Sequence, residues 1–352
     1  MSAPAPSPGP AIGVLGTGSH LPPTVRTNDE VAAATGVSAA WIRDRTGVRE
    51  RHVAAPDEAS SDLAAVAVRH ALAAAGIDAG QLGLLVCATS TPDELGPSTG
   101  CRVQGLVGAS AAVALDVSAA CSGWLFAAKV AHDWLRQESP PGYAAVVGVE
   151  TYSKFLDPTD RGTSVLFADG AAAAVLGPVP PPGGFSDFRL GSDGTLADLV
   201  LIPAGGSRRP ADDRSLADGG HHIHMDGREI SRFIRATFPR LVHEALDRNG
   251  LRLGDLDRII AHQPNPVLLR GLGEELGLGP DRLVVVGDEA GNIGAASAPY
   301  ALAAADARGL LAPGDLALVT VFGAGMTWGS ALLRWSRPVT TSTLPTKDRT
   351  TP

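Results

Sequence analysis

Cysteine, aromatic residues and long apolar runs are all scarce in this chain of 352 residues. Its three cysteines, Cys87, Cys101 and Cys121, form no CxxC pair and no zinc-ligand spacing. A sparse and odd number of cysteines is typical of free thiols in a reducing compartment. Aromatic residues make up 5% of the chain, whereas alanine and glycine are abundant, and this composition favours helices that pack closely on sheets.

The charge and hydropathy patterns exclude two classes of protein. The net charge is −8 and no long basic run is present, so nucleic acid would find little electrostatic attraction. The longest run of small residues, 107–131, contains Asp116 and Lys129 and is therefore a poor membrane span. The proline-rich residues 1–10 lack the basic start and apolar stretch of a signal peptide. We therefore expect a cytoplasmic protein that binds neither nucleic acid nor membranes, with disordered tails at 1–10 and 337–352.

The two halves of the sequence resemble each other. An apolar strand pattern beginning at Leu82 has a counterpart beginning at Leu256, an offset of about 174 residues, and helical patterns precede both. Small-residue turns that run into alanine-rich helices follow at Ala119 and Gly294. A third pair of apolar runs starts at Gly142 and Gly314. Three matched elements at nearly one offset indicate an internal duplication.

The duplication predicts an α/β fold. The short, continuous apolar runs alternate with helices, which favours buried, mainly parallel sheets covered by helices. We expect two similar halves, 11–177 and 187–336, joined by the proline-rich connector 178–186. Loops at equivalent strand ends would meet near a pseudo-twofold axis, so residues far apart in sequence can share one site.

Cys121 follows the strand pattern that ends near Val117 and precedes a helix. A thiol at the start of a helix is near the positive end of the helix dipole, which favours the thiolate, and the adjacent N–H groups can hold an oxyanion. A lone cysteine is more often a small buried hydrophobe, and this interpretation is kept for Cys87 and Cys101.

His262 and Asn292 occupy loops in the second half. His262 follows an apolar strand and precedes Gln-Pro-Asn-Pro, where an imidazole can act on a bound substrate. Asn292 lies in a glycine-flanked turn that opens a helix. Each residue alone is typical of a structural histidine or a turn asparagine. These two residues and Cys121 occupy equivalent loop positions of the two repeated halves, and this placement indicates that the three share a site.

Three other motifs have simpler interpretations. The glycine-rich stretch that begins at Phe322 can turn its amides toward a thioester oxygen, although an ordinary hairpin gives the same pattern. The glycines that begin at Gly13 have the wrong spacing for a dinucleotide fingerprint. The histidines His221, His222 and His224 have no second ligand cluster, so we predict a surface role for them and no metal site.

Cysteine, histidine and asparagine in this chain order also describe a papain-like hydrolase. However, Ala120-Cys-Ser-Gly lacks that family's local pattern around the cysteine, and an internal duplication has no place in that fold. A hydrolase therefore remains a distant alternative.

A set of longer motifs resembles the ketoacyl-ACP synthase III family of the thiolase superfamily. The resemblance extends from about Ile12 to Trp335. It rests on stretches that begin at Trp41 (Trp-Ile-Arg-Asp-Arg-Thr-Gly), Asp116 (Asp-Val-Ser-Ala-Ala-Cys-Ser-Gly), Asp157 (Asp-Pro-Thr-Asp-Arg-Gly-Thr), Phe167 (Phe-Ala-Asp-Gly-Ala), His262 (His-Gln-Pro-Asn), Gly291 (Gly-Asn-Ile-Gly) and Phe322 (Phe-Gly-Ala-Gly-Met-Thr-Trp-Gly).

The resemblance implies a thiolase-like, five-layered αβαβα fold, a homodimer, and no metal or redox cofactor. It implies that Cys121 accepts an acyl group from acyl-CoA, and that His262 and Asn292 then act on malonyl acyl carrier protein. The backbone amides of Cys121 and Ala324 would form the oxyanion hole. Trp41 and Arg161 match residues that hold the adenine of coenzyme A.

The sequence departs from the family's pattern at three positions. Val267 replaces an arginine with which relatives contact the carrier protein. Gly96 and Ser231 replace bulky phenylalanines around the acyl and substrate channel, which suggests a starter larger than acetyl. Some relatives instead pass the acyl group to an oxygen or nitrogen atom without decarboxylation. Asn292 favours condensation over this alternative, because plain acyl transfer needs no enolate clamp.

Overall fold

The computed structural model describes residues 11–138, 142–279 and 281–337. The expected tails, 1–10 and 337–352, lie outside these residues except for Arg337, which is buried. None of the helices in the described ranges is long and apolar enough to cross a membrane.

The elements of the first half run from the N-terminus to the strand that precedes the connector. In chain order they are β1 (Ile12–His20), β2 (Thr24–Thr27), α1 (Asn28–Thr35), α2 (Ala39–Thr46), β3 (Glu50–Val53), α3 (Ser60–Ala75), β4 (Leu82–Ala88), α4 (Thr99–Val107), β5 (Val113–Val117), α5 (Gly123–Gln137), β6 (Tyr143–Thr151) and β7 (Asp169–Pro178). Short 3-10 helices are η1 (Ala79–Gln81), η2 (Ala120–Ser122) and η3 (Tyr152–Phe155).

The second half repeats this order after the connector. Its elements are β8 (Gly184–Ser192), β9 (Val200–Leu201), α6 (Asp213–Ala217), β10 (His224–Met225), α7 (Gly227–Asn249), β11 (Arg258–Ala261), α8 (Pro266–Glu275), β12 (Leu283–Val284), α9 (Gly287–Ala290), α10 (Ser297–Ala307), β13 (Leu316–Gly323) and β14 (Thr327–Arg334). Its 3-10 helices are η4 (Gly194–Leu199), η5 (Leu253–Asp255) and η6 (Gly294–Ala296).

The two five-stranded sheets have the same topology. Their strand orders are β1-β7-β6-β4-β5 and β8-β14-β13-β11-β12. The expected internal duplication is confirmed, because every strand of the first sheet has a partner at the same place in the second. The expectation of mainly parallel sheets was wrong. In each sheet two of the four pairings are antiparallel, namely β1–β7 and β6–β7 in the first and β14–β8 and β13–β14 in the second.

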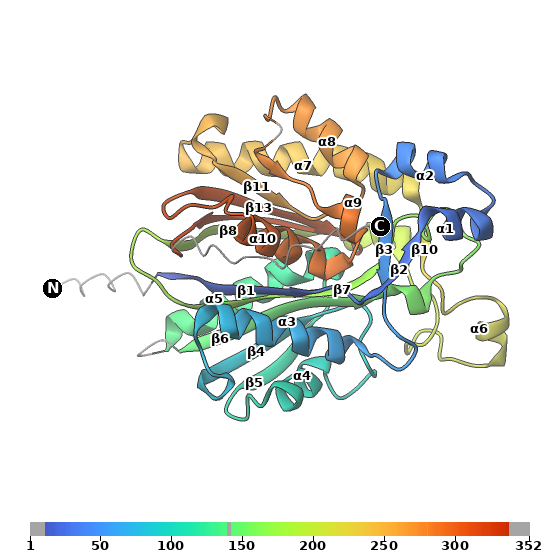
Figure 1. Cartoon of the computed structure of the whole chain (residues 1–352), viewed down its shortest axis with the longest axis horizontal. Helices are drawn as coiled ribbons and strands as arrows, with labels where there is room; N and C mark the ends of the chain where they lie inside the picture. The colour runs from blue at the N-terminus through green and yellow to red at the C-terminus, as the bar shows by residue number, and fades with distance from the viewer. Residues whose placement is uncertain (1–10, 139–141, 280, 338–352) are drawn as a thin grey trace, which may run out of the picture.

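Helices and sheets alternate in five layers (Figure 1). The apolar faces of α5 and α10 fill the space between the sheets, in a core that includes Trp124 and Leu302. The helices α3 and α4 cover the outer face of the first sheet, and α7 and α8 cover that of the second. The thiolase-like αβαβα prediction is therefore correct. It also brings η2 and η6, the starts of the two central helices, side by side.

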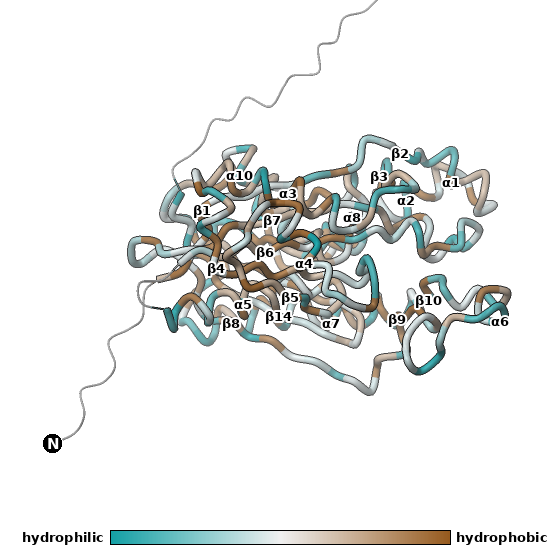
Figure 2. The backbone as a smooth tube through the Cα atoms, turned by 90° about the horizontal axis from the view of Figure 1, so that it is seen from below, coloured by the Kyte–Doolittle hydropathy of each residue, from teal (hydrophilic) through white to brown (hydrophobic). Residues whose placement is uncertain are grey.

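Two excursions from the layers lie at one end of the molecule. One consists of β2, β3, α1 and α2, and the other of β9, β10 and α6 (Figures 1 and 2). Ser38 caps the start of α2 by accepting from the Trp41 amide, and Gly47 ends this helix with φ 75°. The helix α2 contacts α8 of the second half.

Candidate active site

Cys121 lies in the tight turn η2 between β5 and α5. The preceding residue, Ala120, has φ 47°, a left-handed conformation that costs free energy in a residue with a side chain. The helix α5 then begins at Gly123 without a side-chain cap, so its first amides are directed toward the turn. The strained turn presents the Cys121 side chain to a cavity between the two halves.

Burial opposes the thiolate of Cys121. The enclosed position and the nearby Glu150 carboxylate raise the pKa of the Cys121 thiol to about 12. The sequence predicted the opposite direction from the helix dipole. The prediction was wrong because removal of water and a buried carboxylate are features of the tertiary structure. The resting thiol is therefore protonated.

His262 directly follows β11, and its side chain is 2% exposed. Burial lowers the pKa of the imidazole to about 3, so the ring is neutral. The ring lies edge-on to Phe322, with centroids 5.4 Å apart. Its Nδ1 has no hydrogen-bond partner within the described ranges. A neutral imidazole offers one N–H donor and one acceptor to a substrate.

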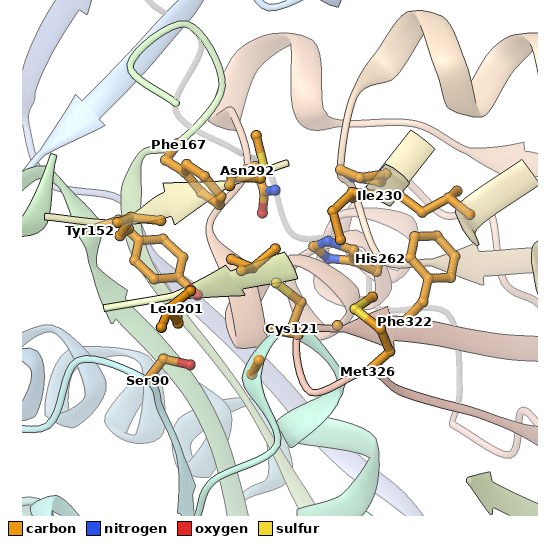
Figure 3. A pocket seen from close by; sticks show the side chains of 18 of the residues that line it. Ser90, Cys121, Tyr152, Phe167, Leu201, Ile230, His262, Asn292, Phe322 and Met326 are labelled. Atoms are coloured by element: carbon orange, nitrogen blue, oxygen red, sulfur yellow. The ribbon is translucent and has the colours of Figure 1, made fainter. Parts of the chain in front are cut away.

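Asn292 is held so that its amide nitrogen is available. Its Oδ1 accepts a hydrogen bond from the Gly294 backbone nitrogen at 3.0 Å, which assigns Nδ2 as the free donor. Figure 3 shows the Asn292 amide and the His262 ring on the same side of Cys121. Cys121, His262 and Asn292 line one cavity of about 230 Å³, as the internal duplication predicted.

The turn between β13 and β14 packs directly on the turn that carries Cys121. A Cβ atom at Gly323 would lie only 2.8 Å from the backbone nitrogens of Cys121 and Ser122. The Thr327 hydroxyl also donates to the Ala119 carbonyl at 3.0 Å. Ala324, from the same turn, lines the cavity. This contact brings the Cys121 and Ala324 backbones to the same wall of the cavity.

A second cavity, of about 420 Å³, adjoins the first on the side of α2 and α8. The two cavities share five lining residues, namely Met225, Ile230, Ile234, Pro264 and Asn292. Ser231 and Val267 line only this outer cavity. The two cavities together form a passage from the surface to Cys121.

The remaining predicted site residues lie outside the catalytic cavity. Trp41 is 36% exposed on α2, and Arg161 is exposed next to Gly162, which lines the outer cavity. Gly96 lies in an exposed loop and lines neither of the two cavities. Cys87 is buried as expected, whereas Cys101 is exposed on α4, contrary to its interpretation as a buried hydrophobe.

Sequence reasoning missed the residues that enclose the inner end of the cavity. These are Ser90, Tyr152 and the segment Val200–Ile202. Tyr152 follows Glu150 at the end of β6, and the buried Glu150 carboxylate accepts from the Ser90 amide at 3.1 Å and from the Thr91 hydroxyl at 2.8 Å. The sequence did contain one indication of these residues, because Glu150 is an acidic residue near the end of the apolar strand β6. The described residues contain no cluster of three or more possible metal ligands.

Comparisons with known proteins agree on one family. Models for 3-oxoacyl-[acyl-carrier-protein] synthase III match residues 115–194, and models for its C-terminal part match residues 246–335. The chain is 41% identical to β-ketoacyl-[acyl-carrier-protein] synthase III from Symbiobacterium thermophilum, over 93% of this chain and 98% of the relative. It is 42% identical to an acetoacetyl-CoA synthase from a Streptomyces species, over 92% and 98%.

Solved structures give the same result. The crystal structure of 3-oxoacyl-(acyl carrier protein) synthase III from Pseudomonas aeruginosa matches with a TM-score of 0.84 and 39% identity, over 94% of this chain and all of that chain. A priming β-ketosynthase from a polyketide biosynthetic pathway matches with a TM-score of 0.85 and 31% identity, over 96% and 99%.

Proposed function

This chain belongs to the β-ketoacyl-[acyl-carrier-protein] synthase III family and is an acyltransferase of that type, and we propose that it joins an acyl group carried on Cys121 to a malonyl thioester. One observation supports the proposal above all. A thiol from one half and an imidazole and an amide from the other line a single cavity that a passage connects to the surface. Such a passage suits a long, thin thioester arm.

In the first half-reaction, the Cys121 sulfur attacks the carbonyl carbon of acyl-CoA. The sulfur loses its proton, the carbonyl oxygen becomes an oxyanion near the Cys121 and Ala324 amides, and coenzyme A leaves as the thiol. Trp41 and Arg161 would hold the adenine end of coenzyme A at the rim. The covalent intermediate divides a difficult condensation into two easier steps.

In the second half-reaction, a malonyl thioester occupies the passage. His262 and Asn292 donate hydrogen bonds to its thioester oxygen, and these bonds stabilise the enolate that forms when carbon dioxide leaves. The enolate carbon then attacks the acyl group on Cys121, and the tetrahedral intermediate collapses to release the 3-oxoacyl thioester and the Cys121 thiolate, which takes up a proton from water. The available Nδ2 of Asn292 supports this role, because the donor is directed into the cavity.

The test is stepwise mass spectrometry of the intact protein. Wild-type protein is mixed with an acyl-CoA, then with malonyl carrier protein, while carbon dioxide is measured. We expect one acyl adduct that Cys121→Ser abolishes, followed by its loss together with carbon dioxide release. Adducts on another residue in Cys121→Ser would contradict the nucleophile. Transfer to a hydroxyl or amine acceptor without carbon dioxide release would favour simple acyl transfer.

A second candidate differs in the extender substrate, which would be malonyl-CoA. Val267 is 43% exposed on α8 at the outer cavity, where an arginine contacts the carrier protein in relatives. Two neighbouring arginines are engaged within the chain, because Arg235 pairs with Glu275 at 3.3 Å and Arg270 pairs with Asp288 at 3.4 Å. Arginines paired in this way attract an acidic protein less strongly than free arginines would. A relative named acetoacetyl-CoA synthase suggests the same substrate. Rates with malonyl-CoA and malonyl carrier protein, measured side by side, separate the two candidates.

We also propose a homodimer formed through the edge of the first sheet. The edge strand β5 pairs with β4 on one side, and its Val113 side chain is 48% exposed. An exposed edge strand can pair with a second copy of itself. Light scattering coupled to size exclusion would give twice the mass of the chain if this is correct.

A further inference from the structure

The catalytic cavity has an outer and an inner end. Its outer end shares five lining residues with the passage from the surface. Its inner end, beyond Cys121, is lined by Ser90, Tyr152 and the segment Val200–Ile202. Figure 3 shows Ser90, Tyr152 and Leu201 on one side of Cys121 and His262 and Phe322 on the other. If a thioester enters by the passage, the acyl group that it leaves on Cys121 extends toward the inner end.

Tyr152 is fixed at this inner end. It is 5% exposed, and its ring lies edge-on to Phe167 with centroids 4.9 Å apart. On another side the ring touches Gly294, where an added Cβ would lie 2.6 Å from both the hydroxyl oxygen and Cε2 of Tyr152. The ring therefore packs against the backbone of η6, in the space that a side chain at position 294 would take.

The Tyr152 side chain lines the same cavity as Cys121 and Ser90. Behind the ring lies Glu150, which is fully buried and whose carboxylate is held by backbone and side-chain donors from Ser90 and Thr91. An acyl chain that displaced the ring would meet this polar, hydrogen-bonded carboxyl group instead of an apolar pocket.

We propose that Tyr152 is a specificity-determining residue whose ring restricts the acyl group on Cys121 to a short, unbranched chain. This inference rests on the proposed function. It differs from the expectation of a larger starter, which depended on Gly96 and Ser231; Ser231 lines the outer cavity, and Gly96 lines neither cavity of this chain. The ring volume sets the limit, since the hydroxyl is small and the aromatic face occupies the space next to the sulfur.

The test measures acylation rates of Cys121 with acetyl-CoA, butyryl-CoA and hexanoyl-CoA by intact-protein mass spectrometry. Three variants are compared with the wild-type protein. Tyr152→Phe keeps the ring, Tyr152→Leu removes it, and Tyr143→Leu makes the same exchange at the far end of β6 as a matched control. Melting temperatures show which variants are folded.

We expect the wild-type protein, Tyr152→Phe and Tyr143→Leu to prefer acetyl-CoA to hexanoyl-CoA by roughly 10- to 100-fold, the range expected for overfilling a packed site. Tyr152→Leu should reduce this preference at least about tenfold. Equal rates with acetyl-CoA and hexanoyl-CoA in the wild-type protein or in Tyr152→Phe would overturn the inference, and these two proteins decide it if Tyr152→Leu does not fold. An unchanged preference in folded Tyr152→Leu would also overturn it. Failure of all three thioesters to acylate Cys121 would instead overturn the proposed function.

Discussion

Asn292 of the second half forms a parallel β-bridge with Phe167 of the first half. The backbone N–H of Asn292 donates to the backbone carbonyl of Leu166 at 2.8 Å, and the backbone carbonyl of Asn292 accepts from the backbone N–H of Ala168 at 3.0 Å. Backbone hydrogen bonds of this kind fix position more firmly than side-chain contacts between mobile loops. The bridge therefore fixes the position of Asn292, and with it the side-chain amide, relative to the half that carries Cys121.

The first prediction concerns Asn292→Ala. This variant should keep the acylation rate of Cys121, because the amide acts only on the second substrate, and should lose roughly 100- to 1,000-fold in condensation. Acylation is followed by intact mass and condensation by carbon dioxide release. Asn249→Ala, the same exchange at the end of α7, serves as the control. Normal condensation by Asn292→Ala would contradict the enolate role.

The second prediction concerns Gly323→Ala. An added methyl group would press on the backbone nitrogens of Cys121 and Ser122, which lie 2.8 Å from its position. Because those nitrogens belong to the turn that carries the nucleophile and one oxyanion donor, acylation should fall about 100-fold. Gly105→Ala is the control, since an added Cβ there meets nothing within 4 Å. Full acylation by Gly323→Ala would show that the two turns need not touch.

The third prediction concerns stability and pH. Burial raises the pKa of Glu150 from 4.5 to about 8, so between these values the folded protein holds a proton that the unfolded chain has released. The free energy of unfolding should therefore fall as pH rises from 4.5 to 8, by up to about 1.4 kcal/mol per pH unit from this group, and level off above pH 8.

Urea unfolding at several pH values measures this dependence. Glu150→Gln should flatten the decline between pH 4.5 and 8, whereas Glu244→Gln, an exposed residue on α7, should leave it unchanged. Parallel curves for the wild-type protein and Glu150→Gln would rule out Glu150 as the source.

The fourth prediction concerns Val267→Arg. A new cation at the rim should increase the condensation rate with malonyl carrier protein by roughly 3- to 10-fold, because rim charges act mainly on the association rate. The rate with malonyl-CoA should change far less. Val130→Arg adds the same charge on α5, where Val130 is 38% exposed. An equal increase in both variants would indicate a general charge effect instead of a docking contact.

The duplicated fold and its shared site were predictable because both depend on local patterns. Apolar runs and small-residue turns repeat at one offset, and this repetition alone indicated that Cys121, His262 and Asn292 would share a cavity. Strand direction was not predictable in the same way. The strand β7 is an apolar run like β6, and such a run does not encode that the two pair in antiparallel.

The features that sequence reasoning missed depend on contacts across the molecule. The pKa of Cys121 depends on enclosure and on Glu150, which lies 29 positions along the chain. Tyr152 belongs to the cavity only because Gly294, 142 residues later, leaves space for its ring. A pattern within one segment cannot reveal either relationship.

The shared walls of the two cavities have a consequence for the order of events. Under the proposed function, both thioesters would reach Cys121 past the same side chains, so free coenzyme A would have to leave before the extender enters. The two substrates would then alternate in a double-displacement scheme, and an excess of either one would slow turnover by occupying the shared passage.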